Sequence, residues 1–186
     1  MSIARIISGT LLILLTGAGA ALGQVTVVSL GTVAGAAKTE VIVPVLLTPA
    51  TTETKVGSIS ATIGFDGRTV TFLRAEKGFL LDGVNGKIQA QPKENNNPEK
   101  SSLDLEVATE GEPRKPLREG LVLSLIFKIN DDTPAGTVAP VRFEKVAAGT
   151  TDNPSKPIEP LTPAPGSIEV LAPESVPYVS CFFFTH

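Results

Sequence analysis

The chain has little of what catalytic and metal sites use. It contains one His, His186, and one Cys, Cys181, in 186 residues. A single His on a Phe-rich tail gives no base for a Ser-His-Asp triad, and one Cys gives no set of zinc ligands. One Cys also excludes an internal disulfide. The sequence therefore predicts a protein that is not an enzyme and that has no cofactor and no metal of its own.

Aromatic side chains and positive charge are also scarce. There is no Trp and one Tyr, and the formal net charge is −3. Without a surplus of Lys and Arg nothing neutralises a row of phosphates, so no nucleic acid is expected as a partner. Sugar-binding sites usually stack sugar rings on Trp or Tyr, so binding of polysaccharide would depend on polar contacts. Asp104 and Glu106 could form a glycosidase pair, but without such aromatics a solvated strand face is the better interpretation.

The first 23 residues have the features of a secretory signal peptide. Arg5 provides a positive charge, residues 11–15 form an apolar run, and the small-residue stretch that ends at Gly23 suits cleavage. The apolar run is too short to span a bilayer comfortably. We therefore predict cleavage after Gly23, secretion to the extracellular space or the cell envelope, and no transmembrane segment in the mature chain.

Clean alternation of apolar and polar side chains marks residues 56–65. The apolar set is Ile59, Ala61, Ile63 and Phe65, and the small or polar set is Ser58, Ser60, Thr62 and Gly64. Side chains of a strand alternate faces with period 2, so this stretch is predicted to be a half-buried strand with one solvated side. The Asp66-Gly67 pair that follows predicts a tight turn and a returning strand.

Short apolar runs separated by turn residues continue along the chain. The predicted strands are 25–33, 40–47, 56–65, 69–75, 87–91, 103–109, 121–129, 137–143 and 167–171. Many of the 17 Gly and 15 Pro fall between these runs, and no amphipathic helix is evident. Short strands with turns between them predict an all-β fold, an antiparallel β-sandwich of about nine strands.

Three stretches differ in composition from the strands. Residues 92–102 are polar and predict an exposed, mobile loop, and residues 150–166 hold five prolines and predict an extended segment. Residues 173–186 form an apolar tail, which is either a contact segment or the scar of a truncated reading frame.

Asp131-Asp132 and Asp152-Asn153 do not match a calcium-binding loop and are better interpreted as turns. The predicted folded domain is 24–172.

Four motifs in order along residues 25–171 resemble the cohesin family, the receptor modules of bacterial cellulosome-type scaffolds. Val41-Ile42-Val43-Pro44-Val45 is similar to the second strand of that family, and residues 57–66 are similar to its third strand, which ends in an aromatic residue and Asp. Residues 123–129, followed by Pro134-Ala135-Gly136, resemble its seventh strand and turn. Residues 166–170 resemble its closing strand.

The resemblance implies a jelly-roll sandwich that binds a dockerin module on one flat sheet face, with any calcium carried by the dockerin. It also implies a setting of extracellular polysaccharide degradation. The face would be built from residues 137–143, 56–65, 103–109 and 87–91. The implied partner-binding residues are Ser58, Ser60, Thr62, Asp104, Glu106, Ala108, Arg142 and Glu144. The alternatives are a carbohydrate-binding module and a structural module of an envelope or secretion assembly, because fold does not fix function.

Overall fold

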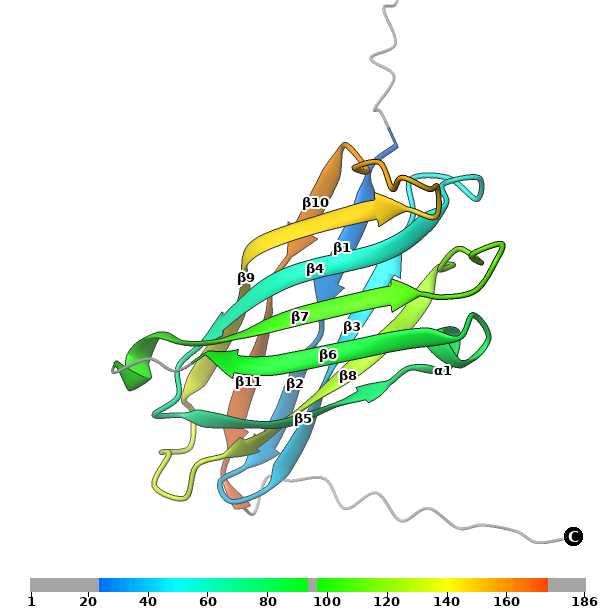
Figure 1. Ribbon diagram of the computed structural model, residues 1–186. Coiled ribbons are helices and arrows are strands. Elements are labelled where there is room, and N and C mark those ends of the chain that lie inside the picture. Colours follow the sequence, from blue (N-terminus) through cyan, green and yellow to red (C-terminus); the bar gives the residue numbers. More distant parts are fainter. Residues whose placement is uncertain (1–23, 94–96, 174–186) are drawn as a thin grey trace, which may run out of the picture.

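The computed structural model describes residues 24–93 and 97–173, which form two sheets packed face to face (Figure 1). The first sheet contains, in spatial order, β10 (Leu161–Ala164), β1 (Thr26–Leu30), β3 (Glu40–Thr48), β8 (Gly120–Ile129) and β5 (Val70–Lys77). The second sheet contains β2 (Thr32–Ala36), β11 (Gly166–Leu171), β9 (Val138–Thr150), β4 (Val56–Phe65), β7 (Ser101–Thr109) and β6 (Gly86–Lys93). The prediction of an all-β sandwich is confirmed. The predicted signal peptide, and the predicted tail from residue 174 on, lie outside the described residues.

The first and last strand segments of the described chain, β1–β2 and β10–β11, cross from one sheet to the other at the same place. β1 pairs with β10 in the first sheet, β2 pairs with β11 in the second, and both pairs are parallel. The chain crosses at Gly31 and, near the other end, between Ala164 and Gly166, where a Cβ on Gly166 would collide with the Gly31 carbonyl. Only glycine permits such an approach of two backbones. The predicted single strand 25–33 is therefore two strands, and not every strand pair is antiparallel.

Two other strand predictions are wrong in extent. β9 runs to Thr150, well past the predicted end at 143, because it continues through a bulge at Glu144. Exposed side chains at Arg142, Glu144 and Lys145 break the alternation there, so the pattern alone ends the strand too early. β10 lies within the proline-rich stretch 150–166. Its Pro163 is tolerated because β10 is the edge strand of its sheet.

Short helical turns also depart from the prediction. α1 (Phe79–Asp82) and the 3₁₀ turn η1 (Pro98–Lys100) each form about one turn, too little for apolar periodicity to reveal. The predicted loop 92–102 is shorter than expected because β6 extends to Lys93 and β7 begins at Ser101. The part of that loop which the structure describes, residues 97–100, is exposed.

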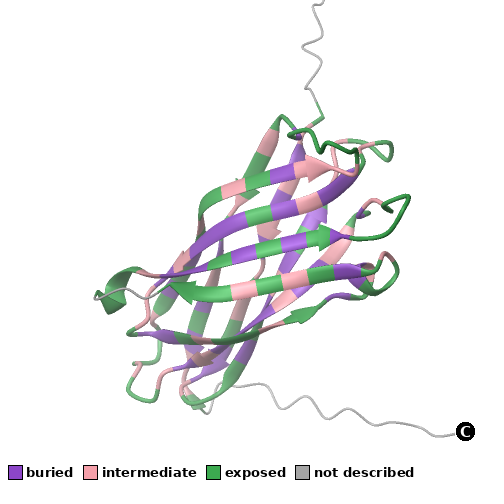
Figure 2. Ribbon diagram, in the orientation of Figure 1, coloured by how far each residue is buried: buried purple, intermediate pink, exposed green. Residues whose placement is uncertain are grey.

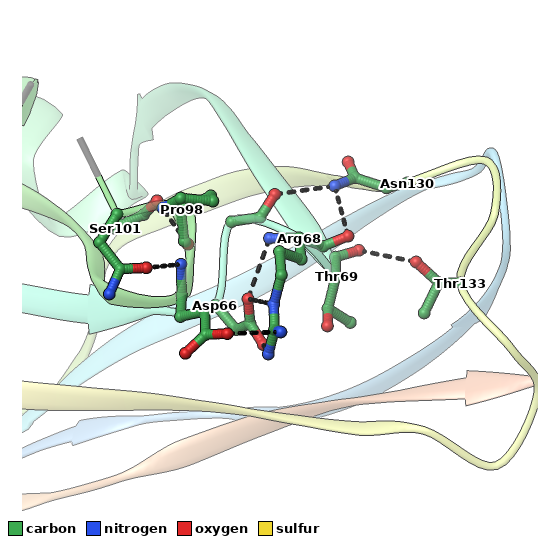
Figure 3. A network of polar contacts seen from close by, with 10 residues as sticks. Asp66, Arg68, Thr69, Pro98, Ser101, Asn130 and Thr133 are labelled. Atoms are coloured by element: carbon green, nitrogen blue, oxygen red, sulfur yellow. Dashed lines mark hydrogen bonds and ion pairs between the residues drawn. The ribbon is translucent and has the colours of Figure 1, made fainter. Parts of the chain in front are cut away.

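The predicted turn at Asp66 connects the two sheets instead of closing a hairpin. β4 pairs with β7 and β9, whereas β5 pairs with β8. Arg68 reaches the carboxylates of Asp66 and Glu99 at 3.0 and 2.7 Å, which ties η1 to the turn (Figure 3). The hydrogen bond from Arg68 lowers the pKa of Asp66. Asn130 Nδ2 donates to the carbonyls of Gly67 and Arg68 at 2.9 Å. The Asp66-Gly67 turn therefore reverses the direction of the chain, but it does not determine which strand β5 pairs with.

The core lies between the sheets, where buried side chains alternate with exposed ones along the strands (Figure 2). Phe127 of β8 is fully buried and contacts Phe65 and Phe72 edge-on, with ring centroids 5.2 and 5.6 Å away. Ile59 and Ile63 of β4 are buried as the alternation predicted. Because these side chains fill the core, the opposite face of β4 is left to form the outer surface of the second sheet.

Candidate functional site

The outer surface of the second sheet brings together the residues that the sequence singled out. β9, β4, β7 and β6 lie side by side in that order (Figure 1). The opposed pairs are Ser58 with Ala108, Ser60 with Glu106 and Thr62 with Asp104, and β9 adds Arg142 and Glu144. We call the outer surface of these four strands the polar face. It is a sheet surface built from regular register, not a cleft.

A hydrogen-bonded network fixes one part of the polar face. Thr62 Oγ1 donates to Asp104 Oδ1 at 2.7 Å, and Lys93 Nζ of β6 lies 2.8 Å from the same oxygen. The hydrogen bond from Lys93, followed by that from Thr62, lowers the pKa of Asp104. Thr62 is buried by this arrangement, with 9% of its surface exposed. Two of the predicted residues are therefore occupied within the chain, and Lys93 is a member that the sequence analysis did not include.

The bulge in β9 determines how Glu144 is presented. Pairing with β4 shifts by one residue between Lys145 and Phe143, so Glu144 has no partner on β4. Its Oε1 lies 2.6 Å from the position that a Cβ on Gly64 would take, so the carboxylate sits over that glycine on the outer surface. The same shift places Lys145 opposite Thr62. Lys145 is thus another residue of the polar face that the early predicted end of the strand concealed.

One half of the polar face carries small side chains on β9 and β4, and at Ala108 of β7. Gly149, Ser58 and Ala108 lie in one row across β9, β4 and β7. Ala147 and Ser60 follow in the next row, beside a shallow hollow between β9 and β7. Small side chains on a flat sheet let the backbone of another element approach closely. This half therefore suits contact with a second macromolecule more than enclosure of a small ligand.

The other half of the polar face is charged. It holds Arg142 and Lys145 from β9 and the pair of Lys93 with Asp104 from β6 and β7. Neither Arg142 nor Lys145 forms an ion pair with another described residue. Glu106, exposed on β7, likewise has no such partner in the described ranges. Arg142 and Glu106 are available to a partner without breaking an ion pair between described residues, whereas Lys145 also attracts the Asp104 carboxylate.

Strand β6, of which residues 87–91 were expected in the face, contributes outward side chains that are not among the eight implied residues. Its outward residues are Lys87, Gln89, Gln91 and Lys93, which lie opposite Ala108, Glu106, Asp104 and Ser102. The signal was present in the sequence, because these polar residues alternate with the half-buried Ile88 and Ala90. The Lys87 ammonium pairs with Glu110 at 2.7 Å beyond the end of β7.

The described residues contain no group of three or more His, Cys, Asp or Glu that could hold a metal. At the two sequence positions considered for calcium, lysines approach the carboxylates: Lys128 lies 2.9 Å from Asp131, and Lys156 lies 4.0 Å from Asp152. The hydrogen bond from Lys128 lowers the pKa of Asp131. At each of these two positions a lysine of the chain already lies against the carboxylate.

None of the helices in the described part of the chain is long and apolar enough to cross a membrane.

Comparison with known proteins identifies the family. The family model of the Cohesin domain matches residues 26–170. No curated protein sequence matches the chain closely enough to count as a relative. One similar solved structure is the sixth cohesin of scaffoldin B from Acetivibrio cellulolyticus, in complex with a mutant Cel5 dockerin. It has a TM-score of 0.61 and 20% identity, over 78% of this chain and 99% of that one.

Two further cohesin structures have the same fold. The third cohesin of ScaC from Acetivibrio cellulolyticus, in complex with the ScaB dockerin, has a TM-score of 0.65 and 19% identity, over 79% of this chain and 99% of that one. The non-cellulosomal cohesin from the archaeon Archaeoglobus fulgidus has a TM-score of 0.62 and 14% identity, over 81% and 94%. At such identities the structures show the fold, and the family match over most of the chain carries the assignment. The chain belongs to the cohesin domain family.

Proposed function

We propose that the chain is a non-catalytic protein-binding module that binds a dockerin-type partner on the polar face. The observation that carries the proposal is the arrangement of β9, β4, β7 and β6, which collects all eight residues implied by the family resemblance on one sheet. Two of the similar cohesins were solved in complex with dockerins. Membership of the same family supports a partner of the same kind for this chain.

The small half of the polar face supports a helix as the contacting element. Ser58, Ser60 and Ala147 project little from β4 and β9, so the backbone of a helix can lie close to the sheet. Close approach maximises van der Waals contact over a flat surface. A large side chain introduced at Ser60 would stand between the two surfaces, so this position is the most sensitive place to test the proposal.

The charged half supports selectivity among partners. Arg142 and Lys145 of β9 have no ion pair with another described residue, and Glu106 of β7, on the far side of β4, has none either. Complementary charges across an interface steer association and penalise the wrong partner. A partner that presents carboxylates near β9 and a cation near Glu106 would satisfy all three.

The rest of the proposal concerns setting and chemistry. The chain acts after secretion, outside the cell or in the envelope, in the degradation of extracellular polysaccharide. It performs no catalysis, and any calcium in the complex belongs to the dockerin. The scarcity of His and Cys supports the absence of catalysis, and the signal-like first 23 residues support secretion. The family match supports the polysaccharide setting and the calcium-bearing partner.

A pull-down from the secreted and envelope fractions of the source organism tests the proposal. The full chain is the bait, once in calcium and once in chelator. We expect capture of a protein with paired calcium-binding loops, lost in chelator and lost with Ser60→Arg. Thr48→Arg is the matched control, because Thr48 is exposed on the outer surface of the other sheet. Retention of polysaccharide alone, or no capture, would overturn the proposal and favour a sugar-binding or structural module.

A further inference from the structure

The outer surface of the first sheet carries exposed apolar side chains. Ile42 and Leu46 of β3 are 57% and 37% exposed, and Leu73 of β5 is 40% exposed. These are three of the five large hydrophobic residues exposed in the described part of the chain. We call these three residues the apolar patch. Exposed apolar groups gathered on one surface usually mark a contact site.

Register explains why the three residues share a surface. Ile42 lies opposite Ile126 of β8, and Ile126 lies opposite Arg74 of β5, next to Leu73 at a bulge. Ile126 is only 2% exposed although it points outward, and it lies outside the core cluster between the sheets. Arg74 covers it, because its guanidinium reaches across β8 to Glu40 of β3 at 3.2 Å. Ile42 and Leu73 flank this covered residue and remain open.

The described chain ends close to the apolar patch. Leu171, the last residue of β11, pairs with Ala36 of β2. The chain turns after Ala36 and enters β3 at Glu40, two residues before Ile42. The end of β11 and the beginning of β3 therefore lie at the same end of the sandwich (Figure 1).

Residues 174–186 follow this point and lie outside the described residues. They number 13, so they reach at most about 43 Å when extended. The patch from Ile42 to Leu46 is about 13 Å long and the sandwich about 10 Å thick, so the segment is long enough. Its sequence is apolar from 176 to 184, with Val176, Tyr178, Val179, Phe182, Phe183 and Phe184, and it contains no Lys or Arg.

We infer that residues 176–184 of this chain pack on the apolar patch. The polar face is a poorer surface for this segment, because Arg142 and Lys145 have no ion pair with a described residue and would be desolvated, whereas Arg74 beside the patch is already paired with Glu40 and Glu76. Tethering a segment this close to its surface gives an effective concentration in the millimolar range, so weak contacts are enough for occupancy. Packing would remove the tail aromatics and the patch from water together, and would leave the polar face open to a partner. This inference does not depend on the proposed function.

The test uses two residues that are unique in the chain. Cys181 is the only Cys and Tyr178 is the only tyrosine, with no Trp present, so a spin label on Cys181 and the intrinsic fluorescence report on the tail alone. In the full chain labelled at Cys181, we expect paramagnetic broadening of the amide signals of Ile42, Leu46 and Leu73. Signals from Ser58 and Ser60, on the opposite outer surface, should remain sharp.

A substitution pair separates the patch from a general effect. Ile42→Asp should abolish the broadening and increase quenching of Tyr178 fluorescence by iodide. Val138→Asp, at a similarly exposed apolar residue of the other sheet, should change neither. Should Ile42→Asp fail to fold, the wild-type measurement still decides, because broadening away from the patch, or none, would overturn the inference. Broadening that is seen only when isotope-labelled chains are mixed with spin-labelled chains would also overturn the inference, because it would come from contact between two copies.

Discussion

The two outer surfaces of the sandwich follow the same alternation, but only the first sheet exposes a group of large apolar side chains beside its charged residues. On the polar face, Ser58 and Ser60 are small and Arg142 and Lys145 are charged without a described ion-pair partner. On the first sheet, Ile42 remains exposed while an arginine and a glutamate bridge over the neighbouring strand. The difference teaches that alternation with period 2 decides which side chains point outward, and that residue type together with the neighbours on adjacent strands decides what each surface can contact.

The largest effect should come from the core that both surfaces share. Phe127→Ala should lower the free energy of unfolding by about 3–5 kcal/mol, because it leaves a cavity under both sheets. Urea denaturation followed by circular dichroism measures the loss. Phe79→Ala is the control, since Phe79 is 74% exposed, and should stay within about 0.5 kcal/mol. Similar losses in the two variants would show that Phe127 does not hold the sheets together.

Charge reversal on each surface should separate their roles. Glu106→Arg should weaken binding of a captured dockerin-type partner by about 10- to 100-fold, because an exposed carboxylate without a described ion-pair partner becomes a cation. Calorimetric titration measures the affinity. Glu40→Arg makes the same change on the first sheet and should leave the affinity unchanged. Equal weakening by both variants would contradict a binding site confined to the polar face.

Removing the bridge across the first sheet should have a smaller effect. Arg74→Ala breaks ion pairs with Glu40 and Glu76, at 3.2 and 2.8 Å, and uncovers Ile126. Because these pairs are exposed, the midpoint of thermal unfolding should fall by no more than about 3 °C. Lys145→Ala removes a cation with no ion pair to a described residue and should leave the midpoint unchanged. A larger fall in the unfolding midpoint for Lys145→Ala than for Arg74→Ala would contradict a stabilising role of the Arg74 bridge.

The smallest effect concerns protonation on the polar face. Lys93→Met should raise the pKa of Asp104 toward its ordinary value of 3.8, because the hydrogen bond from Lys93 is the main cause of its lowering. A lowered pKa in the folded state gives stability that is present above the unfolded value near 3.8 and is lost as pH falls through the folded value. NMR titration of the carboxyl carbons measures the pKa, and urea denaturation at several pH values measures the stability.

Asp131 is the internal control for that titration. Its pKa is lowered mainly by Lys128, beside the first sheet, and should not respond to Lys93→Met. An unchanged titration of Asp104 in the variant would show that Thr62, not Lys93, controls its charge.

Residue pattern predicted the regular strands well and the irregular ones poorly. The bounds and the facing of strand 56–65 were predicted correctly, because apolar side chains alternate with small or polar ones from Ser58 to Phe65 without a break. The break at Gly31 could not be foreseen, since it depends on contact with Gly166 from the other end of the chain. The bulge at Glu144 concealed Lys145 and Ala147 because it shifts the period by one residue.

The residues of the candidate site likewise divide into those in regular strands, whose facing the sequence predicts, and those at irregular positions. Seven of the eight residues implied for it lie within β4, β7 and the regular part of β9, where facing can be read from the sequence, and Glu144 lies at the bulge. Lys93 was missed because the predicted strand ended at 91 and left it in the polar loop 92–102, whereas β6 continues to Lys93 and brings it against Asp104 of β7. Which of the carboxylates is already neutralised by a lysine could be learned only from the packed sheet.

The sequence by itself determined the all-β class, the inward and outward sides of most strands and the family. These depend on alternation and turn residues, which are local properties of the chain. Only the tertiary structure decided that 25–33 splits between two sheets, that the turn after Phe65 joins the sheets, and that Arg74 covers Ile126 across β8. Each of these depends on which strands become neighbours, and a local pattern carries no information about a partner that is distant in the chain.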